Sequence, residues 1–239
     1  KVLSIESCLS LQAHPSKALA AQLHAKDPTN YPDANHKPEM AVTLTPFLAF
    51  SDFCPRDELV ANFKKYPTVY QRLKEHVDHL ATATTEEEQK KALQTLFSAV
   101  NPLPADTLPL RKAEAAAVEP QTVRERVLAD ILESYPTDPT VVLTLAFNIL
   151  ELPPGRAFVM GPHEPHSYIK GEILEVMALS DNVVRLGLTP KFKDYPTMLS
   201  MLEWKRGQKD LVTPAVSHHG HLTTSLYSPK GFEEFACVL

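Results

Sequence analysis

Gln12 and His14 have the residue types and the spacing to share a metal ion. They stand two residues apart in an alternating segment, and alternate residues of a strand point to the same face of a sheet. Further candidates are the cluster 36–39 (His-Lys-Pro-Glu) and the two histidines His163 and His166. Imidazole nitrogens and a carboxylate from separate strands are suitable ligands for a divalent ion. The alternative is that each is an ordinary surface or core residue with its own hydrogen bonds.

Two further segments contain residues that could carry chemistry. Glu175 stands in an otherwise apolar, strand-like segment, 173–179, where a carboxylate is rare unless it is paired or functional. The alternative is an outward-facing residue on an edge strand. After the turn 180–182, Arg185 and Lys191 lie in an expected loop, where a guanidinium fork and an ammonium point charge could bind a phosphate. The alternative there is a solvated basic loop.

Hydrophobic periodicity predicts three parts along the chain. Residues 1–52 follow the period of strands, residues 53–140 mainly that of helices, and residues 141–239 return to strands and turns. Thr85 followed by Glu88 is a capping box, which starts an amphipathic helix. Strands are expected at 40–44, 47–50, 156–160, 166–169, 172–179 and 233–239, a short helix at 17–26, and either a helix or a strand at 141–150.

Two other groups of histidines, one in the helical block and one near the C-terminal end, offer no convincing site. His76 and His79 lie three apart on an expected helix, and the segment 218–221 holds three histidines in an expected loop. Neither group has a carboxylate partner in its pattern. We therefore expect the block 53–140 to cap the strands and to supply no chemistry.

Composition excludes several classes of protein. With 44% hydrophobic and 22% charged residues the chain is typical of a globular domain, and no apolar run reaches the roughly 18 residues of a membrane helix. A net charge of -5 and the lack of a Lys/Arg block argue against a nucleic-acid surface. Three widely spaced cysteines among 239 residues indicate reduced thiols in an intracellular compartment. Both ends fall within strand-like segments, so we expect an interior portion of a longer chain.

Six segments form long words in a fixed order: 1–5 (KVLSI), 11–15 (LQAHP), 31–40 (YPDANHKPEM), 165–168 (PHSY), 180–185 (SDNVVR) and 187–191 (GLTPK). In this order they closely resemble the type I phosphomannose isomerases, which are zinc-dependent members of the cupin superfamily. The resemblance implies a mainly β protein, a cupin-type (jelly-roll) β-sandwich with an α-helical insertion. The parts 1–52 and 141–239 would then belong to the cupin-type β region, the second of them truncated at its end.

The same resemblance assigns roles to individual residues. One Zn²⁺ per chain would be bound by Gln12, His14, Glu39 and His166, and His163 is not among the ligands. Because only one ligand is a carboxylate, the site would keep a single positive charge and act as a Lewis acid. Arg185 matches the essential arginine of the family. Phosphate or substrate contacts fall on Ser10, Lys191 and Lys1, and candidates for proton transfer are His36, Lys37, Tyr168, Glu175 and Asp181.

The resemblance implies an isomerase that interconverts mannose 6-phosphate and fructose 6-phosphate by proton transfer through an enediolate. Such an enzyme would act in the cytoplasm, in carbohydrate metabolism leading to GDP-mannose, as a monomer with a sugar phosphate as its partner and no nucleic acid or membrane. The alternative is a non-catalytic cupin-like metal- or sugar-binding module, or an inactive fragment of the isomerase. A catalytic site would place Arg185 and Glu175 in the same pocket as His166, which a binding module does not need.

Overall fold

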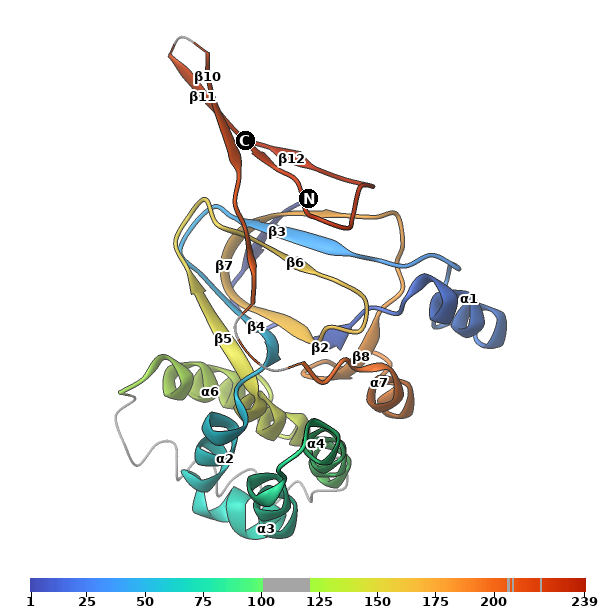
Figure 1. Cartoon of the computed structure of the whole chain (residues 1–239), viewed down its shortest axis with the longest axis vertical. Coiled ribbons are helices and arrows are strands. Elements are labelled where there is room, and N and C mark those ends of the chain that lie inside the picture. The colour runs from blue at the N-terminus through green and yellow to red at the C-terminus, as the bar shows by residue number, and fades with distance from the viewer. Residues whose placement is uncertain (101–120, 206, 208, 220) are drawn as a thin grey trace.

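Antiparallel strands build the framework of the molecule (Figure 1). The computed structural model describes residues 1–100, 121–205, 207, 209–219 and 221–239. Nine strands form one curled sheet, with the order β5-β4-β7-β3-β6-β9 along its main path, β1 and β2 paired with β7, and β8 paired with β2. These strands are β1 (Val2–Ile5), β2 (Leu11–Ala13), β3 (Glu39–Thr43), β4 (Phe47–Phe53), β5 (Phe147–Leu152), β6 (Ala157–Met160), β7 (His166–Met177), β8 (Val184–Gly187) and β9 (Leu211–Val212).

Helices occupy the chain between β4 and β5 and gather below these strands in Figure 1. The helices among the described residues are α1 (Lys17–Lys26), α2 (Arg56–Lys64), α3 (Pro67–Thr82), α4 (Glu86–Val100), α6 (Val123–Ser134), the 3-10 helix η1 (Pro139–Ala146) and α7 (Tyr195–Met201). The expected helix 17–26 is confirmed. The capping box is also confirmed, because the Thr85 amide donates to the Glu88 carboxylate and the Glu88 amide donates to Oγ1 of Thr85. Within the described part of the chain, none of the helices combines the length and the apolar character needed to cross a membrane.

Aromatic side chains join the helices to the outer side of the sheet. Phe53 at the end of β4 stacks on Phe147 at the start of β5, with ring centroids 5.0 Å apart, and on Trp204 at 5.1 Å. Phe97 of α4 packs edge-on against all three rings. A second hydrophobic cluster, which includes Tyr168, fills the interior of the sheet. The strands therefore have one face toward the helices and one toward this interior.

β7 serves both halves of the curled sheet. Its first half pairs with β2 and β4, and its second half pairs with β1 and β3. Gly171 lies between these pairings with a φ of 113°, and a Cβ there would come within 2.5 Å of the carbonyl oxygen of Pro46. The two strands expected at 166–169 and 172–179 are therefore one strand, because glycine lets the backbone bend without ending the pairing.

The pairing of β7 with β4 shifts register between Tyr168 and Lys170, next to the bend at Gly171, and this shift changes which side chains of β7 face the interior. Tyr168 before the bend and Ile173 after it belong to the same hydrophobic cluster, although an odd number of positions separates them. In a regular strand such a pair would point to opposite faces. Glu175 follows Ile173 with the same parity and is also buried. Residues from both halves of β7 can therefore line one interior.

Arg185 lies in a strand, which corrects the expectation of a loop. β8 pairs with β2, and its Val184 and Leu186 are buried in the cluster that includes the helices. Arg185 between them is partly exposed on the other face. Turn residues on both sides of so short a strand concealed it in the sequence.

The C-terminal part differs further from the expectation. Beyond β8 the chain forms β9 and a separate sheet of β10 (Ala215–His219), β11 (Leu222–Tyr227) and β12 (Cys237–Val238), which protrudes at the top of Figure 1. Only the last two-residue strand falls in the segment 233–239 that was expected to be one. The ambiguous stretch 141–150 contains most of η1 and the start of β5, so it is neither a single helix nor a single strand.

We predict that Gly171→Ala lowers the free energy of unfolding by about 2 kcal/mol or more, since both a positive φ and a close backbone contact oppose a Cβ. Gly231→Ala is the matched control, because Gly231 also has a positive φ, 82°, but has open space around the position of its Cβ. The Gly231→Ala change should lower the free energy of unfolding by about 1 kcal/mol. Denaturant unfolding measures both values, and equal losses would contradict the role assigned to the close contact.

Candidate metal centre and active site

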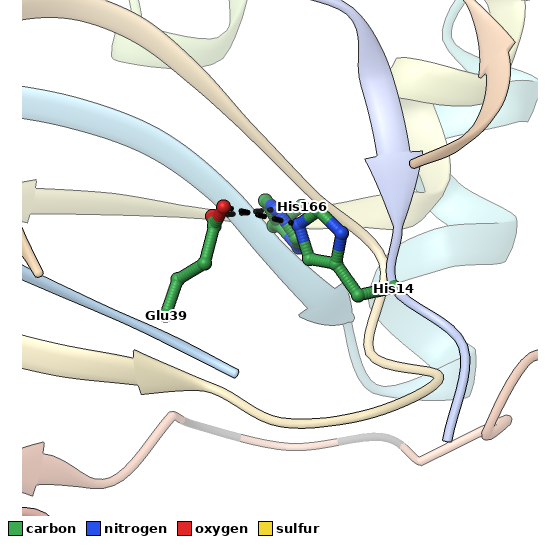
Figure 2. Close-up of side chains that lie close together, drawn as sticks. All are labelled: His14, Glu39 and His166. Atoms are coloured by element: carbon green, nitrogen blue, oxygen red, sulfur yellow. Dashed lines mark ion pairs between the residues drawn. The ribbon is translucent and has the colours of Figure 1, made fainter. Parts of the chain in front are cut away.

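Three side chains from separate strands converge in the interior of the sheet (Figure 2). His14 directly follows β2, Glu39 begins β3 and His166 begins β7. One ligand atom from each lies within 4.8 Å of the other two, and all three residues are at most 1% exposed. Nε2 of His14 is 3.3 Å from Oε1 of Glu39, and Nε2 of His166 is 3.6 Å from Oε2. The carboxylate is thus held between two imidazole nitrogens.

Backbone carbonyl groups fix the orientation of both imidazole rings. Nδ1 of His14 is 2.8 Å from the carbonyl oxygen of Asn182, and Nδ1 of His166 is 3.0 Å from that of Glu164. A carbonyl oxygen only accepts, so each Nδ1 donates to it and each Nε2 is the nitrogen that faces Glu39. Burial lowers the pKa of His14, which keeps this ring neutral. Histidines that bind metal ions are typically oriented in this way.

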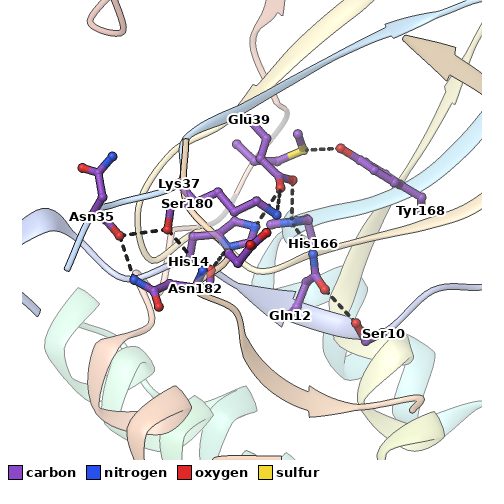
Figure 3. A network of polar contacts seen from close by, with 12 residues as sticks. Ser10, Gln12, His14, Asn35, Lys37, Glu39, His166, Tyr168, Ser180 and Asn182 are labelled. Carbon is purple, nitrogen blue, oxygen red and sulfur yellow. Dashed lines mark hydrogen bonds and ion pairs between the residues drawn. The ribbon is translucent and has the colours of Figure 1, made fainter. Parts of the chain in front are cut away.

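Gln12 and Arg185 extend the cluster across neighbouring strands. Gln12 on β2 is paired with His166 on β7 and with Arg185 on β8, so the three residues lie in one row across the sheet. Nε2 of Gln12 is 3.4 Å from Nε2 of His166, and its Oε1 accepts a hydrogen bond from Oγ of Ser10 at 2.7 Å (Figure 3). A 180° rotation of the Gln12 amide group would exchange its two atoms and direct Oε1 toward His166. The strand parity used for Gln12 and His14 thus brings both residues to the same place.

Three further candidates adjoin the Glu39 carboxylate. Nζ of Lys37 is 2.7 Å from Oε1 of Glu39. The expected burial of Glu175 is confirmed, and this burial raises its pKa, with a further increase from the charge of Glu39. Burial also raises the pKa of Tyr168 well above its usual range, and the charges of Glu39 and Glu175 add to the effect. An amine, a carboxyl group that retains its proton more readily than usual and a protonated phenol therefore lie close to the cluster.

The cluster has the donors and the spacing that a divalent ion needs. Nε2 of His14 and Oε2 of Glu39 are buried without a hydrogen-bond partner among the described residues, which is costly unless a cation lies beside them. The ammonium group of Lys37 contacts Oε1 of Glu39. Tetrahedral zinc with bonds of about 2.1 Å would separate neighbouring ligand atoms by about 3.4 Å. The separations given above between Glu39 and the two histidines are 3.3 and 3.6 Å. Two histidines and one carboxylate, with the Gln12 amide beside them, fit such an ion.

Some expected site residues lie at the edge of this cluster or outside it. His36 pairs with Glu234 at 2.9 Å rather than with the clustered side chains. Asp181 and Lys191 are exposed. The backbone amide of Asp181 donates a hydrogen bond to the carboxylate of Asp33 at 2.8 Å.

Lys1 and His163 are positioned through backbone contacts. The backbone nitrogen of Lys1 donates to the carbonyl oxygen of Glu175, and the Glu175 amide donates back to Lys1, so Lys1 lies beside Glu175 with an exposed side chain. Nε2 of His163 accepts a hydrogen bond from the Ser16 amide at 3.0 Å. Its imidazole is thus engaged with the start of α1 and is not part of the three-residue cluster.

The residues that hold the ligands in place were missed in the sequence. Asn182 is completely buried, and its carbonyl oxygen orients His14, but in the sequence it reads only as part of a turn. Its side chain is bonded to Asp33, which lies well before it in the chain. The available signal was a small amide residue directly followed by two valines, Val183 and Val184, which favours a buried position.

Comparisons with known proteins agree with this geometry. Residues 1–56 match the family described as phosphomannose isomerase type I, catalytic domain. The chain is 38% identical to a mannose-6-phosphate isomerase of Cryptococcus neoformans over 96% of its own length, and 41% identical to that of Homo sapiens over 85%. The chain is thus similar to type I phosphomannose isomerases over nearly its whole length. It spans 60% and 51% of the lengths of these two relatives.

Solved structures of the family share the fold. A crystal structure described as zinc-bound mannose 6-phosphate isomerase matches 95% of this chain and 61% of its own with a TM-score of 0.76 at 29% identity. A mutant phosphomannose isomerase from Salmonella typhimurium matches with a TM-score of 0.79 at 28% identity, over the same shares of the two chains. The cupin-type fold expected from the sequence is confirmed.

We predict that Glu39→Ala and His166→Ala each weaken Zn²⁺ binding by more than about a hundredfold, beyond the losses typical of residues that only orient a ligand. Each change removes a donor from a set with few alternatives. Competition with a coloured chelator measures the affinity. His79→Ala, which removes an exposed histidine of α3, should leave it unchanged. Full zinc content in both site variants would contradict this ligand set.

Proposed function

We propose that the protein is a zinc-dependent aldose–ketose isomerase that interconverts mannose 6-phosphate and fructose 6-phosphate. The convergence of His14, Glu39 and His166, with Nε2 of His14 and Oε2 of Glu39 left without a hydrogen-bond partner, is the observation that carries this proposal. Gln12 would complete the ligand set. The two relatives named above are mannose-6-phosphate isomerases, and one of the similar solved structures is zinc-bound.

The bound ion would supply Lewis-acid chemistry to a sugar carbonyl and to the negative charge that develops beside it. The chain's own residues have to move the proton between neighbouring carbons. Glu175 is suited to this exchange because burial brings its pKa closer to neutrality than that of a solvated carboxyl group. Lys37 is placed to stabilise negative charge, since its ammonium group already contacts the carboxylate of Glu39. Tyr168 would donate a hydrogen bond as a protonated phenol.

The remaining candidates would bind substrate or assist. Arg185 lies in the same row as Gln12 and His166 and is partly exposed, so it can meet a ligand from the solvent side. Lys191 adds a positive charge for the phosphate dianion, which a chain of net charge -5 would otherwise repel. Secondary candidates for substrate binding are Ser10 and Lys1, and those for proton transfer are His36 and Asp181.

The rival function is a non-catalytic metal- or sugar-binding module. Such a module would need the metal ligands but neither a buried carboxyl group nor an arginine beside them. Glu175 is buried under the influence of the Glu39 charge, and Arg185 is in register with Gln12. Both observations favour the isomerase.

We also propose the wider context that the family relationship implies. The parts 1–52 and 141–239 would supply the site, and the part 53–140 would act only as a structural insertion. The enzyme would work as a monomer in the cytoplasm, in carbohydrate metabolism leading to GDP-mannose.

A coupled isomerase assay on the full-length protein tests the proposed function. Enzyme stripped by a chelator should lose its turnover of mannose 6-phosphate, and stoichiometric Zn²⁺ should restore it, because the ion would supply the Lewis acid that polarises the sugar carbonyl. Mg²⁺ at the same concentration is the control, since it disfavours a site rich in imidazole. A protein that binds zinc but shows no turnover would leave only the binding module.

We predict that Arg185→Ala lowers kcat by at least about a hundredfold, as for removal of one preorganised donor that stabilises developing charge. Zinc content and folding should be retained, because the side chain faces away from the core. Arg72→Ala, on the exposed face of α3, is the matched control and should change neither kinetic constant. A normal kcat with a raised KM would make Arg185 a phosphate anchor. Normal values of both would remove it from the site.

A further inference from the structure

A buried network around Asn182 and Asp33, to which the proposed chemistry gives no role, joins the segments 180–182 and 33–35. Asn182 is completely buried, and its side-chain nitrogen lies 2.6 Å from the carbonyl oxygen of Asp33, 2.9 Å from that of Asn35 and 3.1 Å from Oδ1 of Asp33 (Figure 3 shows Asn35, Ser180 and Asn182). The amide group has two protons for these three acceptors. The side-chain nitrogen of Asn182 therefore connects the segment 180–182 to the segment 33–35.

The Asp33 carboxylate closes the same connection from the other side. Its Oδ1 accepts from the Asn35 amide at 2.9 Å and from Oγ of Ser180 at 2.9 Å, and its Oδ2 accepts from the Asp181 amide at 2.8 Å. These bonds lower the pKa of Asp33 despite its partial burial. Hydrogen bonds to an ionised carboxylate are about twice as strong as neutral ones, so the pair Asp33 and Asn182 forms a stable clamp.

Each segment held by this clamp leads directly to the candidate metal centre. The backbone carbonyl of Asn182 receives the Nδ1 proton of His14 at 2.8 Å and so sets which nitrogen of that ring faces Glu39. The segment 33–35 continues to Lys37 and Glu39, which starts β3. Movement of the clamp would therefore rotate the His14 ring relative to the Glu39 carboxylate.

We propose that Asn182, held by Asp33, is a positioning residue that determines how tightly and in what geometry His14 and Glu39 bind the metal ion. The role rests on the proposed metal centre. Asn182 touches neither ion nor substrate, and it acts through its backbone carbonyl on His14. The sequence segments 31–40 (YPDANHKPEM) and 180–185 (SDNVVR) are thus in contact through this clamp.

Asn182→Asp tests this role at nearly constant volume. The change replaces a donor by a carboxylate oxygen that faces the Asp33 carboxylate and two carbonyl oxygens, so the segment must move and carry its own carbonyl with it. The control is Asn62→Asp in α2, where the amide also donates to a backbone carbonyl, that of Leu145 at 3.0 Å, but in the helical block. Both variants are made in the full-length protein.

The readouts are Zn²⁺ affinity by chelator competition, the visible absorption spectrum of the Co²⁺-loaded protein, and Tm of the metal-free protein. Asn182→Asp should weaken Zn²⁺ binding at least about tenfold, as for other residues that orient a ligating histidine, and should alter the Co²⁺ spectrum. Asn62→Asp should lower Tm at most and leave both metal readouts unchanged. The spectrum separates positioning from stability, because it reports ligand geometry only in molecules that are folded and loaded.

Unchanged Zn²⁺ affinity and spectrum in Asn182→Asp would overturn the proposal, as would an equal loss of affinity in Asn62→Asp. If Asn182→Asp does not fold, Ser180→Ala replaces it, since it removes only the hydroxyl that contacts Asp33 and Asn35 and accepts from the Asn182 amide. This variant should weaken Zn²⁺ binding at least about threefold, because a single lost hydrogen bond already has an effect of that size, with a shifted Co²⁺ spectrum; wild-type values would overturn the proposal. An unmodified protein that binds no stoichiometric zinc would instead refute the metal centre itself.

Discussion

Glu39 carries a negative charge into the interior of the sheet, where its side chain is 1% exposed. An ionised carboxylate in such a place is costly unless cations or hydrogen-bond donors compensate it. Lys37 supplies one ammonium group, and the two neighbouring histidines turn Nε2 toward the carboxylate, because their Nδ1 atoms are bonded to backbone carbonyl groups. The positions of β2, β3 and β7 thus bring two imidazole nitrogens and a carboxylate together at a spacing that suits a cation.

The shape of β7 makes this arrangement possible within one small sheet. His166 lies before the bend and Glu175 after it, and a straight strand with their odd separation would place them on opposite faces. A register shift between Tyr168 and Lys170, next to Gly171, reverses the parity, so that one strand presents a ligand nitrogen and a buried carboxyl group to the same interior. The same bend lets β7 pair with four other strands.

Local patterns in the sequence were sufficient for the helix 17–26, for the helical character of the middle block and for part of the site, but they missed α7 (Tyr195–Met201). The capping box at Thr85, the parity of Gln12 and His14, and the unusual position of Glu175 in an apolar run are all signals confined to a few residues. The single strand β7, the short strand β8 and the clamp between Asp33 and Asn182 depend on pairings between distant segments, which no local pattern contains. The ligand set itself came from the family resemblance, since scattered histidines are common in any chain of this size.

The helical insertion leaves the sheet and returns to it at two residues that face each other. Phe53 ends β4, Phe147 begins β5, and the two are paired across the strands and stacked ring on ring. A connection whose ends already meet costs little more entropy when it lengthens, because closure entropy rises only with the logarithm of loop length. Family members could therefore exchange, shorten or extend this insertion during evolution, provided that the replacement still covers the aromatic stack of Phe53, Phe147 and Trp204.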